Sequence, residues 1–284
     1  MTRKLLLPTD FSKNALQAIN YALKLYKEDS CVFYILNVFS ATSNVFSSLL
    51  NMEPGSELYE KAKAKSEKGL AKLLDTLLFN DESNVKHVFK TISVFNNPVE
   101  AIKIFVEQKD IEIIVMGTKG ESNREKSAFG SVAITVMEKV RNCPVIVVPE
   151  AATLSLPTEI VFPTNYKTPI KRRELNYLID IAKKCSASIE ILHICEQEKL
   201  SIKQIENKQL LEEYFEGQLY SFHRLSHYSV ETAVNLFIES RRSDMVAFIN
   251  RKHVFFGSVF TQPLVKELGF YSKVPILVMH DLKN

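Results

Sequence analysis

The chain has no tryptophan, only four cysteines and only eight glycines in 284 residues, and these shortages exclude several classes of protein. No two cysteines form a C-x-x-C pair, which argues against a zinc ribbon or a thioredoxin-like site. No apolar run approaches the roughly 18 residues of a membrane span, and the apolar run Leu5–Leu7 is too short for a secretory signal. We therefore expect a cytoplasmic protein whose cysteines are buried free thiols.

An excess of charge of either sign is also lacking. Lysine and arginine number 36 against 33 aspartates and glutamates, and the charges are dispersed along the chain. This balance predicts neither nucleic-acid binding nor membrane binding. Hydrophobic content of 46% with 24% charged residues is typical of a soluble globular protein. The length suits two domains of about 140 residues, each large enough to bury its own core.

The few glycines are concentrated in one stretch. Gly117, Gly120 and Gly130 all lie within Met116–Val132, between a short β-branched run that suits a buried strand and a run with helical spacing. Glycine after a strand lets the backbone approach a ligand without a Cβ in the way, and the first N–H groups of a helix form an anion site. We interpret the stretch as a phosphate-binding loop, in which Ser131 adds a hydroxyl and nearby basic side chains offset phosphate charge.

The spacing of this loop, Gly-x2-Gly-x9-Gly-Ser, differs from two common phosphate loops. Neither Gly-x-x-x-x-Gly-Lys-Ser/Thr nor Gly-x-Gly-x-x-Gly occurs in the chain. Together with the preceding Val115-Met116 and the later segment Cys143–Val148, the loop resembles the universal stress protein family. Nucleotide-binding members of that family carry this pattern between the fourth strand and the fourth helix of an α/β fold.

The resemblance implies a fold and a site. The fold would be a doubly wound parallel five-stranded sheet of strand order 3-2-1-4-5, of the adenine-nucleotide alpha-hydrolase-like type. Asp10 and Val38 would hold the base and ribose, and Met116 would pack on the adenosine. The phosphates would meet backbone and hydroxyl donors of Gly117, Gly120, Gly130, Ser131 and Val132. From the residues alone, the alternative for Asp10 is a turn aspartate bonded to its own backbone.

Hydrophobic periodicity predicts the elements that carry this site. Ser12 is expected to cap a helix, and Asn97-Pro98 to open another. The strands expected in the first half are Leu5–Leu7, Cys31–Val38, Val88–Val94, Ile111–Met116 and Val145–Val148, and the helices are Asn14–Tyr26, Ser56–Leu78, Val99–Glu107 and Val132–Arg141.

The second half repeats the pattern of the first. Lys4–Asp10 is echoed by Glu159–Asn165, Tyr34–Val38 by Glu190–Ile194, and Cys143–Val148 by Val274–Met279, in the same order along the chain. We therefore predict two tandem domains, residues 1–150 with an intact nucleotide loop and residues 151–284 with a degenerate one. The second domain would act as a covalent partner in a pseudo-dimer and serve a structural or regulatory role, and further homodimerisation is open.

The degeneracy lies at the ligand positions. Asn165 stands opposite Asp10, and Ile249 and Lys252 stand opposite Gly117 and Gly120; a shift of one residue would put Asn250 at the first glycine instead. A β-branched residue resists the positive φ that glycine tolerates. We expect the region Ile249–Gly257 to be closed to phosphates, with Phe255-Phe256 filling the space.

Other features of the second half carry less chemistry. Gln204–Tyr220 predicts a long surface helix, His223 and His227 have no third metal ligand nearby, and His193 is best explained as a hydrogen-bonded structural histidine. Gly-x-Ser-x-Gly is absent, which argues against a dedicated hydrolase of that type. The sequence thus predicts a stress-response protein that binds ATP, ADP or AMP and hydrolyses ATP slowly at most. A triphosphate could bring Mg²⁺, for which no motif names ligands, and the alternative is a nucleotide-independent interaction scaffold.

Overall fold

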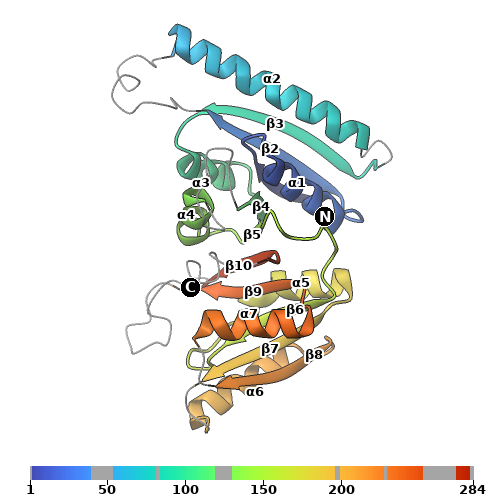
Figure 1. Cartoon of the computed structure of the whole chain (residues 1–284), viewed down its shortest axis with the longest axis vertical. Coiled ribbons are helices and arrows are strands. Elements are labelled where there is room, and N and C mark those ends of the chain that lie inside the picture. The colour runs from blue at the N-terminus through green and yellow to red at the C-terminus, as the bar shows by residue number, and fades with distance from the viewer. Residues whose placement is uncertain are drawn as a thin grey trace.

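A computed structural model describes residues 2–39, 54–80, 84–118, 130–195, 199–226, 229–251 and 273–281. Within these ranges, the strands form one ten-stranded sheet in the order β3-β2-β1-β4-β5-β10-β9-β6-β7-β8 (Figure 1). Each half contributes five parallel strands in the order 3-2-1-4-5, which confirms the predicted fold. The two sheets are continuous, because β5 pairs with β10 in antiparallel register.

The elements of the first half lie close to their predicted positions. Ser12 caps α1, where its side chain accepts a hydrogen bond from the N–H of Ala15, and Asn97 caps α3. The strands are β1 (Arg3–Pro8), β2 (Cys31–Phe39), β3 (His87–Phe95), β4 (Ile113–Gly117) and β5 (Val145–Val148). The helices are α1 (Lys13–Leu25), α2 (Glu57–Asn80), α3 (Pro98–Gln108) and α4 (Ser131–Lys139).

The second half follows the same sequence of elements, with one prediction wrong. The helix expected over Gln204–Tyr220 ends at Tyr214, because Gly217 turns the chain at φ +77° and Tyr220 already belongs to a strand. The strands are β6 (Glu159–Thr164), β7 (Ser188–Cys195), β8 (Tyr220–Ser226), β9 (Met245–Asn250) and β10 (Ile276–His280). The helices are η1 (Arg172–Leu175), α5 (Asn176–Cys185), α6 (Ile202–Tyr214) and α7 (Val230–Arg241).

Helices cover both faces of the sheet, as Figure 1 shows, and side chains alternate between two cores. One core packs against α1, α2, α5 and α6, and the other against α3, α4 and α7. Each core contains residues of both halves, such as Leu5 and Leu277 in the first and Leu6 and Val278 in the second. The seam between the halves is therefore an apolar interior as well as a line of backbone hydrogen bonds.

Polar clusters close the seam at both of its ends. At one end, Arg3 of β1 contacts Asp180 of α5 at 2.7 Å and Asp29 at 3.5 Å. Lys184 of α5 pairs with the same Asp29, and its ammonium lies 4.1 Å from the centroid of the Tyr26 ring. These contacts fix α5 of the second half against the first strand of the chain.

The other end of the seam carries a second cluster. Arg141, just after α4, pairs with Asp281 and donates to the carbonyl of Asn250 at 2.7 Å, and the Asn250 amide donates to the carbonyl of Met137 at 2.9 Å. Both clusters pair an arginine of the first half with an aspartate of the second, but on different elements: β1 and α5 at one end, and the segments after α4 and β10 at the other.

Strand register places the two halves in correspondence. Leu5 pairs with Ile113, and its counterpart Ile160 pairs with Met245. Counting along β4 and β9 from these pairs sets Gly117 opposite Ile249, as the unshifted alignment predicts.

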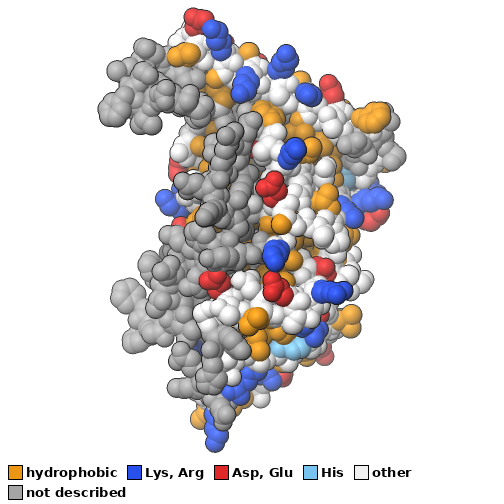
Figure 2. All heavy atoms as spheres, viewed as in Figure 1, with side chains coloured by type: hydrophobic (Ala, Val, Ile, Leu, Met, Phe, Trp, Pro, Cys, Tyr) orange, Lys and Arg blue, Asp and Glu red, His pale blue; other side chains and the backbone are white. Residues whose placement is uncertain are grey.

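No helix within the described ranges is both long and apolar enough to cross a bilayer. Positive and negative side chains are interspersed on the face in Figure 2, with hydrophobic side chains between them.

Candidate functional site

The predicted ligand residues gather at the carboxyl edge of β1, β2 and β4. The N–H of Thr9 donates to the carbonyl of Leu36 at 2.8 Å, and the Asn37 amide donates to the carbonyl of Thr9 at 2.7 Å. These bonds hold the end of β1 against the end of β2, so that Asp10 lies next to Val38. Met116, which is 6% exposed, follows Ile114 on the adjoining strand β4. The fold therefore brings three residues that are far apart in sequence to one edge.

Asp10 sits in a tight turn that uses its carboxylate. Its Oδ1 accepts a hydrogen bond from the N–H of Ser12 at 3.1 Å, and the hydroxyl of Thr9 accepts one from the N–H of Phe11 at 3.0 Å. These bonds support Phe11 at φ 66°, a left-handed conformation uncommon for a bulky residue. The turn role foreseen as an alternative for Asp10 is therefore present, and it leaves open a further role for the same carboxylate.

Gly117 is required by packing at the end of β4. A Cβ at this position would lie 2.7 Å from Oδ1 of Asn14 and 3.0 Å from its carbonyl carbon, so α1 can approach the strand only where a side chain is missing. Asn14 is buried and cross-links the edge: its amide donates to the carbonyl of Val148 at 3.0 Å, and the hydroxyl of Thr118 donates to its Oδ1 at 3.2 Å. Sequence reasoning missed Asn14, because it lies 103 residues from the glycine it contacts.

Gly130 stands at the start of α4. Its N–H donates to the carbonyl of Thr118 at 2.5 Å, which brings the start of the helix back to the end of β4. As the N-cap residue it has no side chain to accept from the first helical N–H groups. Ser131 and Val132 follow it on the exposed side of the first turn. A helix start of this kind attracts an anion through its N–H groups and its dipole.

Several predicted residues lie outside the described ranges. These are Gly120, the basic residues Lys119, Arg124 and Lys126, and in the second half Lys252, His253, Phe255, Phe256, Gly257 and Ser258. His227 lies outside them as well. Their parts in the predicted sites stay predictions.

The corresponding edge of the second half keeps the turn and changes the ligand positions. Asn165 accepts from the N–H of Lys167 at 3.0 Å, as Asp10 does from Ser12, and Tyr166 adopts φ 54°. His193 contacts the carbonyl of Thr164 at 3.1 Å, where Asn37 contacts Thr9 in the first half, and this confirms it as a hydrogen-bonded histidine. The side chain of Ile249 packs against the core at the place of Gly117.

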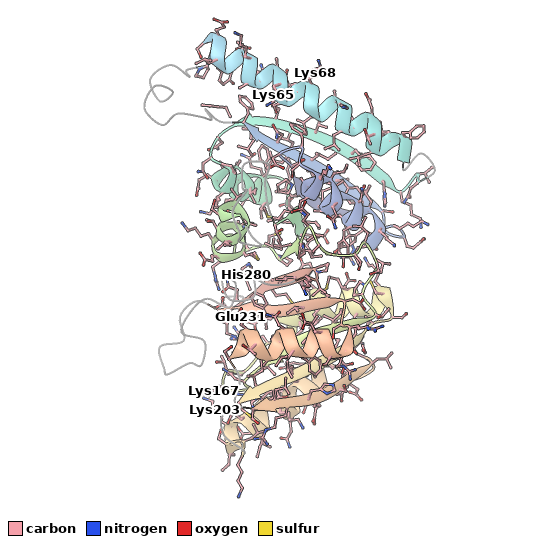
Figure 3. All side chains as sticks on the ribbon, in the orientation of Figure 1. Lys65, Lys68, Lys167, Lys203, Glu231 and His280 are labelled. Carbon is pink, nitrogen blue, oxygen red and sulfur yellow. The ribbon has the colours of Figure 1, made fainter. Side chains whose placement is uncertain are left out.

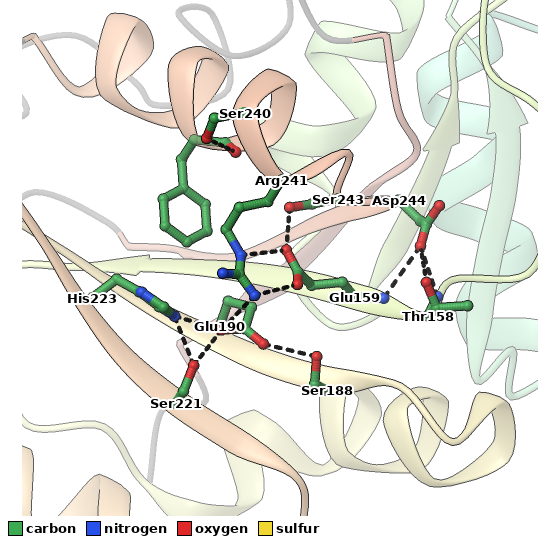
Figure 4. Close-up of polar contacts among 11 residues, drawn as sticks. Thr158, Glu159, Ser188, Glu190, Ser221, His223, Ser240, Arg241, Ser243 and Asp244 are labelled. Atoms are coloured by element: carbon green, nitrogen blue, oxygen red, sulfur yellow. Dashed lines mark hydrogen bonds and ion pairs between the residues drawn. The ribbon is translucent and has the colours of Figure 1, made fainter.

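A second polar cluster lies near the amino ends of β6, β7 and β8 (Figure 4). Glu190 is 3% exposed and accepts hydrogen bonds from Ser188 at 2.8 Å and from Ser221; it also contacts Nε2 of His223 at 2.5 Å. Burial opposes the charge on Glu190, but these hydrogen bonds and the nearby Arg241 outweigh it and lower the pKa of the carboxyl.

This cluster is not a catalytic triad, although it combines serine, histidine and a carboxylate. Ser221 and Glu190 both contact the same nitrogen of His223, Nε2. A triad needs the carboxylate on one ring nitrogen and the nucleophile on the other, so that the histidine can accept the proton of the serine. The cluster is therefore a buried polar anchor between strands.

Three of the four cysteines are unreactive thiols, and the described part of the chain shows no metal-binding group of histidine, cysteine and acidic side chains. Burial raises the pKa of the Cys31 thiol to about 12 and that of Cys185 to about 11, and it raises the pKa of Cys143 further. Such thiols stay protonated and unreactive near neutral pH. Among the described residues, no three histidine, cysteine or acidic side chains are grouped so as to hold a metal ion.

The architecture defines a doubly wound α/β protein with its candidate site at the carboxyl edge of the sheet. A sequence model of the universal stress protein family matches residues 1–149, and the chain belongs to that family. It is 30% identical over 156 residues to the universal stress protein MJ0531 of Methanocaldococcus jannaschii, an alignment that covers 51% of this chain and 81% of that protein.

Solved structures resemble the chain over nearly its whole length. A universal stress protein from Archaeoglobus fulgidus superposes with a TM-score of 0.70 at 20% identity, covering 97% of each chain. A protein of unknown function from Pseudomonas aeruginosa gives a TM-score of 0.60 at 12% identity, covering 98% of this chain and 92% of the other. At these identities the likeness concerns the fold, which both halves of the chain share with these proteins.

Proposed function

We propose that the protein binds an adenine nucleotide at the carboxyl edge of its first half, residues 1–150. The observation that carries this proposal is the contact between Gly130 and Thr118, which brings the start of α4 to the end of β4. The uncapped start of α4 is thereby held at the end of β4, on the same edge of the sheet as the ends of β1 and β2. Membership of the universal stress protein family makes a nucleotide the fitting ligand for such an edge.

Each predicted residue has a distinct part in this proposal. The Asp10 carboxylate accepts from the ribose hydroxyls, the backbone of Val38 meets the adenine edge, and Met116 packs on the adenosine. Backbone N–H groups and the serine hydroxyl bind the phosphates, contributed by Gly117, Gly120, Gly130, Ser131 and Val132. Mg²⁺ would accompany ATP through its phosphates, because the described residues offer no group of three ligands for a metal.

The proposed mechanism is binding rather than turnover. A general base must lie within hydrogen-bond reach of the attacking water, and the motif supplies no side chain with that role. The second half, residues 151–284, would support the first through the shared sheet. Asn165 and Ile249 at its ligand positions also favour a second candidate function, in which this half is a nucleotide-independent surface for protein partners.

The first test is mass spectrometry of small molecules released when freshly purified protein is denatured, followed by calorimetric titration with ATP, ADP and AMP. We expect Gly130→Leu to weaken binding at least a hundredfold, because a side chain at the helix start would occupy the phosphate position. Thr135→Leu is the control, since it places the same leucine side chain about one turn further along α4.

A second variant tests the ribose contact. Asp10→Asn installs the residue that the second half carries at this position, and we expect about tenfold weaker binding with little change in stability, because Asn can still accept from the N–H of Ser12. If neither released nucleotide nor binding of any of the three nucleotides is detected, the proposal is wrong and the nucleotide-independent candidate takes its place.

A further inference from the structure

A cavity of about 320 Å³ lies in the second half, between α6 and the carboxyl ends of β6, β7 and β8. Tyr166, His193, Leu200, Lys208, Phe222 and Arg224 are among the residues that line it. Its volume is at the lower end of the range of about 300–1,000 Å³ that small-molecule sites occupy. The lining combines aromatic rings with cationic side chains, which is the composition of a site for an organic anion.

This cavity is not the counterpart of the proposed nucleotide site. Val38 and Met116 belong to the core on the side of α3 and α4, whereas Tyr166 and Phe222 belong to the core on the side of α6. The aromatic lining of the cavity therefore faces the side opposite to Val38 and Met116, and the cavity is not a copy of the site of the first half.

The corresponding place in the first half carries different residues and contacts. Ser66 of α2 and Ser93 of β3 are hydrogen-bonded at 2.7 Å, which ties the long helix to the sheet. The ring of Phe11 lies so close to Gly69 that a Cβ there would be 2.5 Å from it. Asn37 and Ser93, which pair in register, correspond to His193 and Arg224, which also pair in register. The second half has larger and more basic residues where the first half has small neutral ones.

His193 presents a buried hydrogen-bond acceptor at this cavity. Its side chain is 4% exposed, and Nδ1 lies 3.1 Å from the carbonyl of Thr164. A carbonyl only accepts, so Nδ1 carries the proton, and burial lowers the pKa of the ring and keeps it neutral. Nε2 is then unprotonated and can accept a hydrogen bond through its lone pair, and it has no partner among the described residues. An acceptor left unmet in the interior costs free energy that a ligand donor would recover.

Cationic groups surround the same space. The ammonium of Lys208 lies 4.4 Å from the centroid of the Phe222 ring and 3.3 Å from the carboxylate of Glu212, and Arg224 lies beside His193 on the neighbouring strand. Lys167 and Lys203 extend from the same end of the second half in Figure 3, where Gln204 of α6 donates to the carbonyl of Asn165 at 2.8 Å. An anion that enters would compete with Glu212 for Lys208.

We propose that this cavity binds a small anion that carries a planar ring and an N–H or O–H donor. The ring lies among Tyr166, Phe222 and Leu200, the anionic group meets Lys208 and Arg224, and the donor meets Nε2 of His193. Both an aromatic carboxylate and a mononucleotide have this chemistry. The two are separated by titrating 4-hydroxybenzoate and AMP, with inorganic phosphate as a probe for charge alone.

The titrations use the full chain carrying Gly130→Leu, so that binding of AMP to the first half does not contribute. Nitrogen NMR of the histidine side chains reports on the site directly, because an N–H or O–H donated to Nε2 moves the resonance of that nitrogen. We expect 4-hydroxybenzoate or AMP to bind with a Kd below 1 mM and to shift the His193 Nε2 signal, while phosphate does neither. If 4-hydroxybenzoate binds and shifts the His193 Nε2 signal while AMP does not, the ligand is an aromatic carboxylate. If AMP does so and 4-hydroxybenzoate does not, the ligand is a mononucleotide.

Residues of the first half supply matched variants. His193→Asn keeps a donor for the carbonyl of Thr164, as Asn37 does for Thr9, and Arg224→Ser copies Ser93. We expect each to weaken binding about tenfold without a large change in melting temperature, whereas Lys183→Ser, which removes an exposed charge on α5, leaves affinity unchanged. Glu212→Gln should tighten binding several-fold by releasing Lys208.

Three results would overturn this proposal. They are the absence of binding by both ring-bearing probes, binding of phosphate as tightly as either of them, and affinities that the His193 and Arg224 variants do not change. Each can occur whether or not the first half binds nucleotide, because the first-half site is disabled in every titration. The two proposals therefore fail separately.

Discussion

The two halves of the chain share one plan of strands and differ at two corresponding places. In the first half, Gly117 at the end of β4 leaves room for Asn14 of α1, and Phe11, Ser66 and Ser93 lie under α2. In the second half, Ile249 occupies the edge at β9 and the space under α6 is a cavity. The repeated fold thus keeps its hydrogen-bonded turns, while the residues at its edge and under its outer helix differ between the halves.

The largest expected effect tests the difference at the edge. Gly117→Val should lower the free energy of unfolding by about 3 kcal/mol, because the added carbons would overlap Asn14 and its backbone. Urea denaturation followed by circular dichroism measures the loss. The matched control is Ile249→Val at the corresponding position, which removes one methylene from a partly buried side chain and should cost about 1 kcal/mol.

A double-mutant cycle identifies the cause of that loss. Asn14→Ala removes the side chain that a residue at 117 would meet, so the combined loss in Gly117→Val with Asn14→Ala should be smaller than the sum of the single losses. Additive losses would mean that the steric conflict lies elsewhere.

The next effect concerns a buried histidine that the first half does not have. His280 is 5% exposed at the end of β10, and register places Pro149 at the corresponding position after β5. Burial, and then the nearby charge of Arg141, lower the pKa of His280 to about 4, against about 6.5 in an unfolded chain. The unfolded chain therefore takes up a proton between these values while the folded chain does not.

The contribution of neutral His280 to the free energy of unfolding should be fully present above about pH 6.5. It should fall as the pH drops toward 4. The loss amounts to at most about 3 kcal/mol, from about 1.4 kcal/mol for each pH unit between the two pKa values. Denaturation at a series of pH values measures it. His280→Leu should flatten the curve in this window, and parallel curves for the two proteins would contradict the assignment.

A smaller effect tests how firmly the halves are joined. Arg3→Met removes the cation that contacts Asp29 within the first half and Asp180 across the seam, which should cost about 1–2 kcal/mol. Because these contacts join β1 to α5, we also expect the single thermal transition to broaden as the halves lose part of their coupling. Differential scanning calorimetry would detect this, and an unchanged transition width would show that the apolar seam alone sets the cooperativity.

The smallest effect supplies the contrast for Arg3. Arg241 pairs with Glu159 at 2.6 Å and is more exposed than Arg3, and both partners lie within the second half. Arg241→Met should therefore cost less than about 1 kcal/mol and leave the width of the transition unchanged, in the same calorimetric measurement. Broadening in this variant as well would mean that any loss of charge loosens the chain.

The sequence was sufficient to predict elements whose signals are local. Ser12 and Asn97 mark helix starts that need only the residues next to them, and β5 is an unbroken apolar run. The echo between the halves gave the register that sets Ile249 opposite Gly117. The helix of the second half was predicted too long, because the turn at Gly217 lies within a polar and aromatic run that continues the helical composition.

Contacts between distant segments could not be predicted in the same way. Gly117 was explained by phosphate approach alone, while its contact with Asn14 depends on how closely α1 packs on β4. Likewise, His193 was expected to be hydrogen-bonded, but the cavity beside it arises from four elements whose spacing no local pattern encodes. Hydrophobic periodicity predicts which segments are strands and helices, but it does not predict how closely they pack.

The polar clusters at the two ends of the seam lie on different elements, which has a consequence for how such a chain can evolve. When two identical subunits meet across a two-fold axis, every substitution appears twice and must suit both places. Here Arg3 meets Asp180 at one end and Arg141 meets Asp281 at the other, and neither pair is repeated by symmetry. Joining the copies in one polypeptide frees each side of the junction to change alone.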